Sequence, residues 1–333
     1  MKGRNLALLL VALGILIAIY AIQQLSTGKK SVSESVVQIL PDFNSSSVNM
    51  IKAYKQGYPD SGLAFAKQDG KWAVTNYFNA PGKESEIDKL LNDVKSMQGE
   101  VRSTNTELFA EYQIGDSAAL HLEFDSSDGS LLSHILVGKG VPQASQSSFV
   151  RKFGSATVYK TDQNLLSRFA AWDAEPWKRL PAKRWTELSI TDTDKEQVKA
   201  MEIVANGKRY MFERLQEENP DTAAPPKYTW KQVEPTKGRM LEDSQIQSIL
   251  GRITRLTASD IVGREQSGEY GLIKAKYTAG FTSHDGSVVR VNFGNEADTT
   301  SKARYVSVDG SPFVYQVVKN NFDSVFETPF KKD

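Results

Sequence analysis

The chain has 333 residues, of which 24% are charged and 40% are hydrophobic, and its formal net charge is +1. This composition can build hydrophobic cores for about two domains and excludes an intrinsically disordered protein. The near-neutral charge lacks the excess of Lys and Arg that a nucleic-acid surface needs, so we expect no nucleic-acid partner. Because the chain contains no cysteine, disulfides, a thiolate nucleophile and a zinc ribbon are excluded.

The N-terminus carries an apolar run. No residue from Leu6 to Ile22 is charged, and as a helix this run would be about 26 Å long, close to the thickness of a bilayer core. We therefore predict a membrane anchor over residues 1–28, with its span at 6–22, and a linker over 29–45. A cleaved signal peptide is the competing interpretation, but Tyr20 spoils the nearest match to a cleavage site at Ala18.

Charges beside the run predict its orientation. Lys2 and Arg4 favour a cytoplasmic N-terminus, although Lys29 and Lys30 on the other flank reduce the asymmetry. We expect a single-pass protein of the inner (cytoplasmic) membrane whose bulk is extracytoplasmic, in the periplasm.

The rest of the chain contains an internal repeat. SSDGS at 126–130 recurs as SHDGS at 283–287, and FVRKFGSATVY at 149–159 recurs as YVSVDGSPFVY at 305–315 with five of eleven positions identical. Three more landmarks recur at nearly the same offset, namely Trp72 with Trp230, Tyr112 with Tyr270, and Gly138 with Gly294. We predict two tandem homologous domains, residues 46–187 and 188–333.

Both copies show the same local patterns. An i, i+3, i+4, i+7 apolar stripe follows Ser85 and again Ser244, which predicts one amphipathic helix per copy, the second opened by a capping box of Ser244 with Gln247. Alternating strands flank Asp-Gly at 128–129 and 285–286, and we expect type I′ hairpin turns there. Further strand pairs join at Gly154 and Gly310. The predicted fold class is α+β, with an N-terminal transmembrane helix and, in each domain, an antiparallel sheet with one main helix.

The three histidines give no catalytic or metal site. His284 precedes the second Asp-Gly turn, and no nucleophile motif such as G-x-S-x-G accompanies it, so we interpret it as a turn residue. His121 and His134 have no second histidine or carboxylate at metal-ligand spacing, which favours structural or solvent-facing roles. We expect no catalytic residue, no metal and no cofactor.

Tryptophans supply the only candidate contact residues. Trp72 and Trp230 begin short strands and are expected in the core. Trp172, Trp177 and Trp185 lie in a stretch rich in Lys and Arg, which could contact membrane headgroups or a partner, or seal the interface between the domains. The sealing interpretation is favoured because PWKR at 176–179 is echoed by PFKK at 329–332. The Pro-rich segment 219–226 reads as an exposed loop.

The chain resembles a known bacterial family, the "domain of unknown function 4340" family. The resemblance rests on the N-terminal span and on the following elements: Gly70-Lys71-Trp72, Ile87 to Leu91, Glu111-Tyr112-Gln113-Ile114, Asp128-Gly129, Gly138, Val158-Tyr159, and in the second copy Glu269-Tyr270-Gly271-Leu272 and Val314-Tyr315. Many members are encoded beside ABC-transporter subunits and gliding-motility-type transport components, which implies an accessory role outside the membrane. The family has no established catalytic residues.

Two functions remain as hypotheses. The first is a non-catalytic, membrane-anchored extracytoplasmic binding or scaffold module, accessory to an ABC-type transport complex, whose partner is an ABC permease or an associated subunit; a cleft between the copies is a usual place for a ligand. The alternative is an envelope hydrolase that uses carboxylates the sequence does not single out.

Overall fold

The computed structural model describes residues 13, 36–172, 175, 177–217, 228–238, 240–264 and 267–330. Apart from Leu13, the predicted membrane span at 6–22 lies outside the described residues, as does the Pro-rich segment 219–226. Within the described ranges, no helix is long and apolar enough to cross a membrane.

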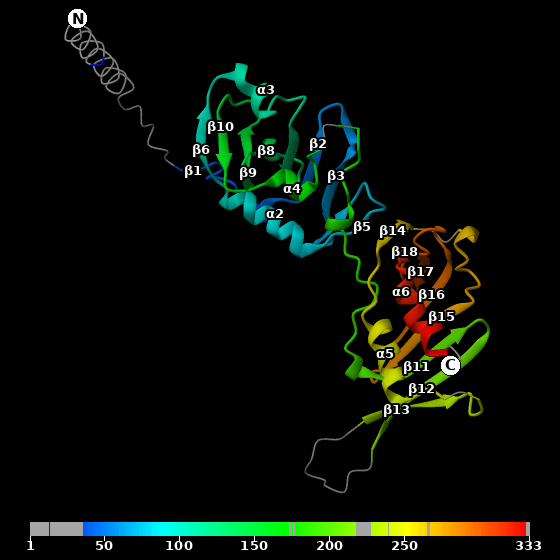
Figure 1. Cartoon of the computed structure of the whole chain (residues 1–333). Helices are drawn as coiled ribbons and strands as arrows, with labels where there is room; N and C mark the ends of the chain where they lie inside the picture. The colour runs from blue at the N-terminus through cyan, green and yellow to red at the C-terminus, as the bar shows by residue number, and fades with distance from the viewer. Residues whose placement is uncertain are drawn as a thin grey trace, which may run out of the picture. The chain divides into compact units, whose positions relative to one another are not determined.

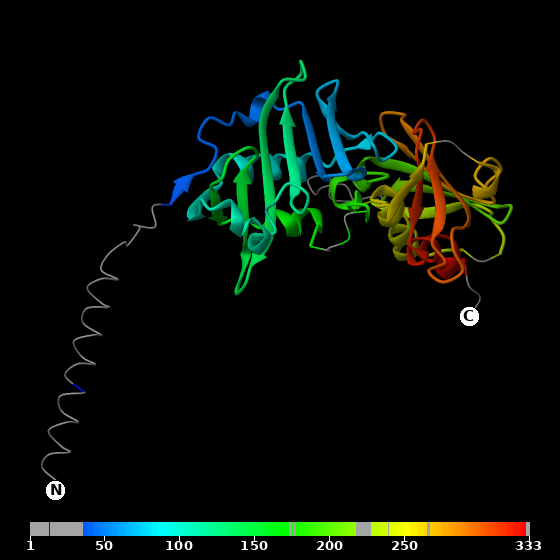
Figure 2. The ribbon, with the colours of Figure 1, turned by 90° about the horizontal axis from the view of Figure 1, so that it is seen from above.

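The described chain is an α+β protein with two antiparallel sheets and few helices, as predicted. By its internal contacts it divides into unit 1, Met1–Gly62 with Asp88–Leu180, and unit 2, Leu63–Ile87 with Pro181–Asp333. This division places residues 63–87 with the C-terminal unit, whereas the predicted repeat boundary follows residue 187. Figure 1 labels helices and strands of each unit and colours them by residue number, and Figure 2 shows the same ribbon from above.

The first sheet has ten strands in the order β1-β6-β10-β9-β8-β7-β2-β3-β4-β5. Their bounds are β1 Val37–Gln38, β2 Met50–Lys55, β3 Tyr58–Gln68, β4 Lys71–Val74, β5 Ala80–Pro81, β6 Gln98–Ser103, β7 Leu120–Asp125, β8 Leu131–Val141, β9 Ala144–Lys152 and β10 Val158–Thr161.

The second sheet has eight strands in the order β13-β12-β11-β15-β16-β17-β18-β14. Their bounds are β11 Val198–Ala205, β12 Lys208–Gln216, β13 Tyr228–Glu234, β14 Asp260–Gly263, β15 Tyr277–Ser283, β16 Val288–Glu296, β17 Arg304–Val308 and β18 Val314–Val317. Read in the same direction, the first sheet has the equivalent order β4-β3-β2-β7-β8-β9-β10-β6, with β5 and β1 added at its two edges. The duplicated sequence landmarks therefore correspond to a duplicated strand order.

Helices lie between the strands at equivalent places in both copies. The α-helices are α2 Glu84–Ser96, α3 Phe109–Tyr112, α4 Leu165–Phe169, α5 Asp243–Thr254 and α6 Lys319–Phe322. Short 3-10 turns are η1 Ser45–Ser47, η2 Thr106–Leu108, η3 Lys183–Trp185, η4 Lys195–Gln197, η5 Gly268–Tyr270 and η7 Thr328–Phe330, and η6 Asp323–Glu327 is a π-helical turn.

The two main helices have the predicted buried stripes. In α5 the apolar residues Ile246, Ile249, Leu250 and Ile253 are at most 1% exposed. The corresponding side chains of α2, which are Ile87, Leu90, Leu91 and Val94, are at most 5% exposed. The predicted capping box of α5 is wrong by two residues, because Glu242 and Gln245 form it.

The first residue of each main helix accepts a hydrogen bond from a neighbouring strand. Asp243 Oδ1 accepts a hydrogen bond of 2.6 Å from the backbone N–H of Trp230, and Glu84 Oε1 accepts one of 2.7 Å from that of Trp72. Each helix start is thereby tied to the strand that carries the buried tryptophan.

Both Asp-Gly sites are hairpin turns, but not of the predicted type I′. In the second turn φ is positive at Gly286 (88°) and not at Asp285. Ser283 N–H bonds Ser287 O at 2.9 Å, so the loop has three residues and its glycine takes the left-handed position. Asp285 Oδ1 accepts the Ser287 N–H at 2.9 Å, which favours this turn. The turn at Gly129 (φ 83°) has the same bonds.

Candidate functional site

The five tryptophans separate by burial. Trp72, Trp185 and Trp230 are 2%, 0% and 7% exposed, whereas Trp172 and Trp177 are 65% and 60% exposed. Trp185 packs edge-on against Phe65 with ring centroids 5.4 Å apart, inside unit 2. Of the three candidate contact residues, Trp185 is thus a core residue and the other two present their rings to solvent.

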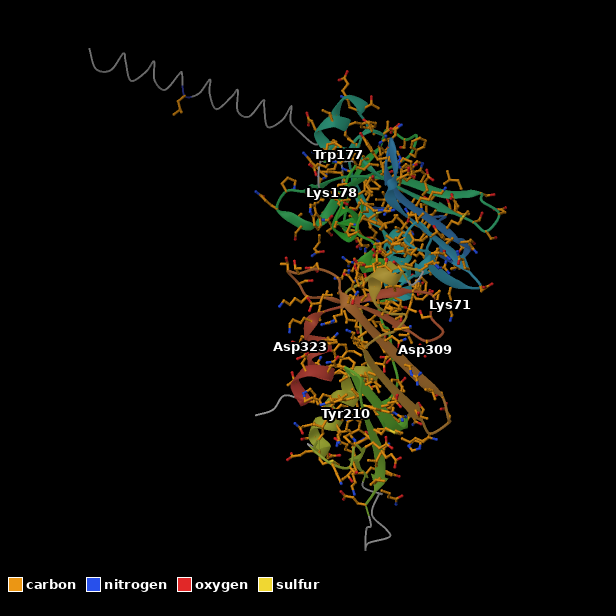
Figure 3. The ribbon with its side chains drawn as sticks, turned by 90° about the vertical axis from the view of Figure 1, so that its right-hand side faces the viewer. Lys71, Trp177, Lys178, Tyr210, Asp309 and Asp323 are labelled. Carbon is orange, nitrogen blue, oxygen red and sulfur yellow. The ribbon has the colours of Figure 1, made fainter. Side chains whose placement is uncertain are left out.

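Trp177 is held to unit 1 through its backbone. Its carbonyl oxygen accepts a hydrogen bond of 2.8 Å from the hydroxyl of Ser61, and its ring meets Tyr58, itself 40% exposed, edge-on at 6.5 Å. Lys178 follows it directly and is exposed as well (Figure 3). Trp177 and Lys178 therefore present an aromatic and a basic group to solvent.

Trp172 lines a pocket of about 300 Å³ in unit 1. The pocket lies where neighbouring strands end: Lys55 of β2 pairs with Leu120 of β7, and Leu120 pairs with Val137 of β8. Leu166 of α4, a helix that contacts β8 (Figure 1), also lines the pocket. Aliphatic side chains thus form much of the wall, with an exposed indole beside them.

Two lysines line this pocket, Lys55 and Lys139, and Lys139 has no ion-pair partner among the described residues. The other polar lining residues are Gln113 and Ser117, and none of the described lining residues is acidic. The site can therefore bury an apolar group and attract a negative charge.

A second polar cluster lies on strands β7 and β8. His121 Nδ1 and His134 Nε2 are 3.0 Å apart, and His121 Nε2 lies 2.6 Å from the carbonyl oxygen of Asp116. The ring of Phe153 stacks on His134 at 4.3 Å, with the planes only 12° apart. From the sequence, neither histidine has a second histidine at metal-ligand spacing. In the structure the two rings nevertheless lie side by side, because the hairpin brings their strands together.

Hydrogen-bond chemistry defines the tautomers of this pair. A carbonyl oxygen can only accept, so His121 carries its proton on Nε2 and offers Nδ1 as an acceptor to His134 Nε2–H. The free nitrogen, His134 Nδ1, lies 4.0 Å from Glu123 Oε1. Burial is the largest influence on the pKa of His134 and lowers it, and the charge of Glu123 opposes this without reversing it. The neutral form of His134 is thus favoured.

Glu123 belongs to a network with Tyr54 and Lys52. Burial would raise the pKa of Glu123, but the hydrogen bond from Tyr54 and the charge of Lys52 outweigh it and hold the pKa below its usual value. Burial, followed by the hydrogen bond to Glu123, raises the pKa of Tyr54. Lys52 Nζ also lies 3.1 Å from Asp125 Oδ2, and this bond raises the pKa of Lys52. Glu123 is thereby an ionised acceptor and a poor proton donor.

The other sequence-predicted residues occupy turn and core positions. His284 is exposed, and its backbone N–H donates to Gln197 O at 2.8 Å. In the described part of the chain no group of three or more His, Asp or Glu side chains is arranged to hold a metal ion.

Sequence reasoning missed the pocket lysines and the histidine pair. Lys55 and Lys139 are far apart in sequence and line one pocket only because β7 pairs with both of their strands. For the histidines a signal existed, because the predicted hairpin across Asp128-Gly129 already places both on neighbouring strands.

Comparison with known proteins adds one match. The family described as "Domain of unknown function (DUF4340)" matches residues 72–275 and 230–331. The two matched segments begin at Trp72 and Trp230, the pair of tryptophans that are equivalent in the repeat. Searches of curated proteins and of solved structures find no significant match. Because the matched segments together cover residues 72–331, the chain belongs to the DUF4340 family.

Proposed function

We propose that the protein is a non-catalytic, membrane-anchored extracytoplasmic module that binds or positions a membrane-protein partner. The observation that carries this proposal is the exposure of Trp172 and Trp177 in one basic segment of unit 1. Tryptophan is enriched among the residues that dominate binding energy at interfaces, because a large rigid ring buries much area at low entropic cost. The apolar run at 6–22 supports the anchor.

An ABC-type complex is the proposed setting. Its support is the resemblance to a family whose members are often encoded beside ABC-transporter subunits. The partner would then be a permease or a transporter-associated subunit.

Affinity capture from membranes tests the partner contact. The full-length protein is extracted in mild detergent, and we expect other membrane proteins to be co-purified. Trp177→Ala should reduce their recovery several-fold without lowering the thermal unfolding midpoint, because the Ser61 bond to its backbone remains. Ile273→Ala, at a site that is 66% exposed, is the matched control and should leave recovery unchanged.

Two results would contradict the proposal. One is repeated recovery of the protein alone from crosslinked membranes. The other is equal loss of partners in both variants, since this would show that exposed apolar area in general, and no specific surface, holds them.

A further inference from the structure

We propose that the pocket beside Trp172 binds a small anion that carries an apolar group, of the kind represented by a short alkyl phosphate. This inference goes beyond the partner contact proposed above and does not depend on it. It rests on a comparison of the pocket with the equivalent place in the second repeat.

Strand register defines that equivalent place. Leu120 pairs with Val137 across β7 and β8, and Tyr277 pairs with Phe293 across β15 and β16. The two pairs correspond because each is followed by the equivalent glycine, Gly138 or Gly294. Where the first copy has two aliphatic side chains, the second copy therefore has two aromatic rings.

The second repeat fills this space with four rings. Phe322 of α6 lies 4.9 Å from Tyr277 between ring centroids, and Phe326 of η6 lies 4.9 Å from Phe293. The offset that relates Val158 to Val314 aligns these two phenylalanines with Leu166 and Ala170. At all four positions the first copy thus has a smaller side chain, and this leaves the opening of about 300 Å³.

The same comparison accounts for the charge. Lys55 pairs with Leu120 where Ala205 pairs with Tyr277, so this lysine replaces an alanine. Lys139 follows Gly138 where Asn295 follows Gly294. No ion-pair partner of Lys139 occurs among the residues that the structure describes. The second copy closes without either cation, so Lys139 is not needed to close this part of the fold.

Space and charge together define the ligand class. The aliphatic floor and the exposed indole of Trp172 favour an apolar group, and the cation of Lys139 favours a negative group beside it. A volume of about 300 Å³ suits a short chain and not a complete two-chain lipid.

Calorimetric titration of the full-length protein in amphipol tests this. Hexyl phosphate is the probe, and inorganic phosphate and hexanol are the controls that carry only the charge or only the apolar group. We expect saturable binding of hexyl phosphate and binding of either control that is at least tenfold weaker. Equal binding of inorganic phosphate or of hexanol would overturn the proposal, as would the absence of saturable binding.

Variants locate the binding. Lys139→Gln should weaken hexyl phosphate about tenfold, because it removes a charge-assisted hydrogen bond. Leu166→Phe introduces the residue that the second copy has at this position, and it should abolish binding by filling the space. A thermal melt of this variant checks that it is folded. Ile273 is exposed and lies outside the pocket lining, so Ile273→Ala should bind normally. Unchanged affinity in both Lys139→Gln and Leu166→Phe would refute the site, whereas failed capture in the partner experiment would leave it intact.

Discussion

The backbone carbonyl of Tyr112 lies directly against Gly138, so that a Cβ on this glycine would be 2.4 Å from the carbonyl oxygen. The second copy repeats the arrangement, with 2.0 Å between a Cβ on Gly294 and the carbonyl oxygen of Tyr270. The Glu-Tyr motifs and the strand glycines are therefore two halves of one contact. Only a residue without a side chain permits this approach of the two backbones.

Gly138→Ala should destabilise the protein by about 1–3 kcal/mol, the usual cost of forcing a methyl group into a packed site. Because the clashing atom is backbone oxygen, a side-chain rotation cannot relieve it. Urea unfolding of the full-length protein measures the effect. Gly140→Ala on the same strand is the matched control, since its Cβ would meet its nearest neighbour at 3.8 Å. Equal stability of the two variants would contradict the packing argument.

Two substitutions in the turn at 283–287 should differ in their effect on stability. Gly286→Val should cost at least about 1 kcal/mol, because φ is 88° there and L-residues disfavour the left-handed region. His284→Ala keeps the backbone bond to Gln197 and should change stability by less than about 0.5 kcal/mol. Thermal melts check both. Loss of cellular function in His284→Ala at normal abundance would show that the histidine has a role beyond the turn.

Periodicity explains which parts of this fold were predictable. The helix stripes that begin at Ile87 and Ile246, and the strands on both sides of each Asp-Gly pair, are local patterns, and each is confirmed. The predicted type I′ turn is wrong, because the Asp285 side chain accepts the Ser287 N–H and favours a three-residue loop. Local sequence patterns therefore predict where the helices and strands lie, whereas the turn type depends on a side-chain hydrogen bond.

The candidate site was less predictable, since it depends on contacts between distant residues. Trp172 and Trp185 lie in one stretch of the sequence, residues 170–185, yet one is 65% exposed and the other fully buried. Lys139 becomes a pocket residue only once β7 and β8 are in register. Aligning the copies position by position would have revealed the missing rings, because Leu166 stands where the second copy has Phe322.

Membrane attachment remains a prediction. We expect the protein to stay with the membrane fraction, because residues 6–22 carry no charge. We also expect that protease added to spheroplasts will digest the bulk of the chain. Cleavage should occur most readily at 219–226, where proline and small residues read as an exposed loop. Immunoblotting of the fractions checks this. Release of a soluble periplasmic form with a shortened N-terminus would show instead that the apolar run is a cleaved signal.

The half-buried His134 predicts a pH dependence of stability. Since burial lowers the pKa of His134 in the folded protein, the unfolded chain binds more protons between that value and its ordinary pKa of about 6.5. The contribution of His134 to stability is then fully present above about pH 6.5 and is lost as the pH falls toward the folded pKa. The groups that face His134 are Glu123 and Asp116, which oppose the shift of its pKa, and His121 and Arg151, which add to it.

The urea midpoint of the full-length protein, measured at several values between pH 7.5 and pH 5 (about the range in which a histidine titrates), tests this contribution. His134→Gln should flatten the dependence, because glutamine keeps an amide that can donate to His121 Nδ1 but takes up no proton. His284→Ala, in an exposed turn, controls for the removal of a histidine. If His134→Gln and the unaltered protein lose stability in parallel as the pH falls, His134 is not the group that links protonation to unfolding.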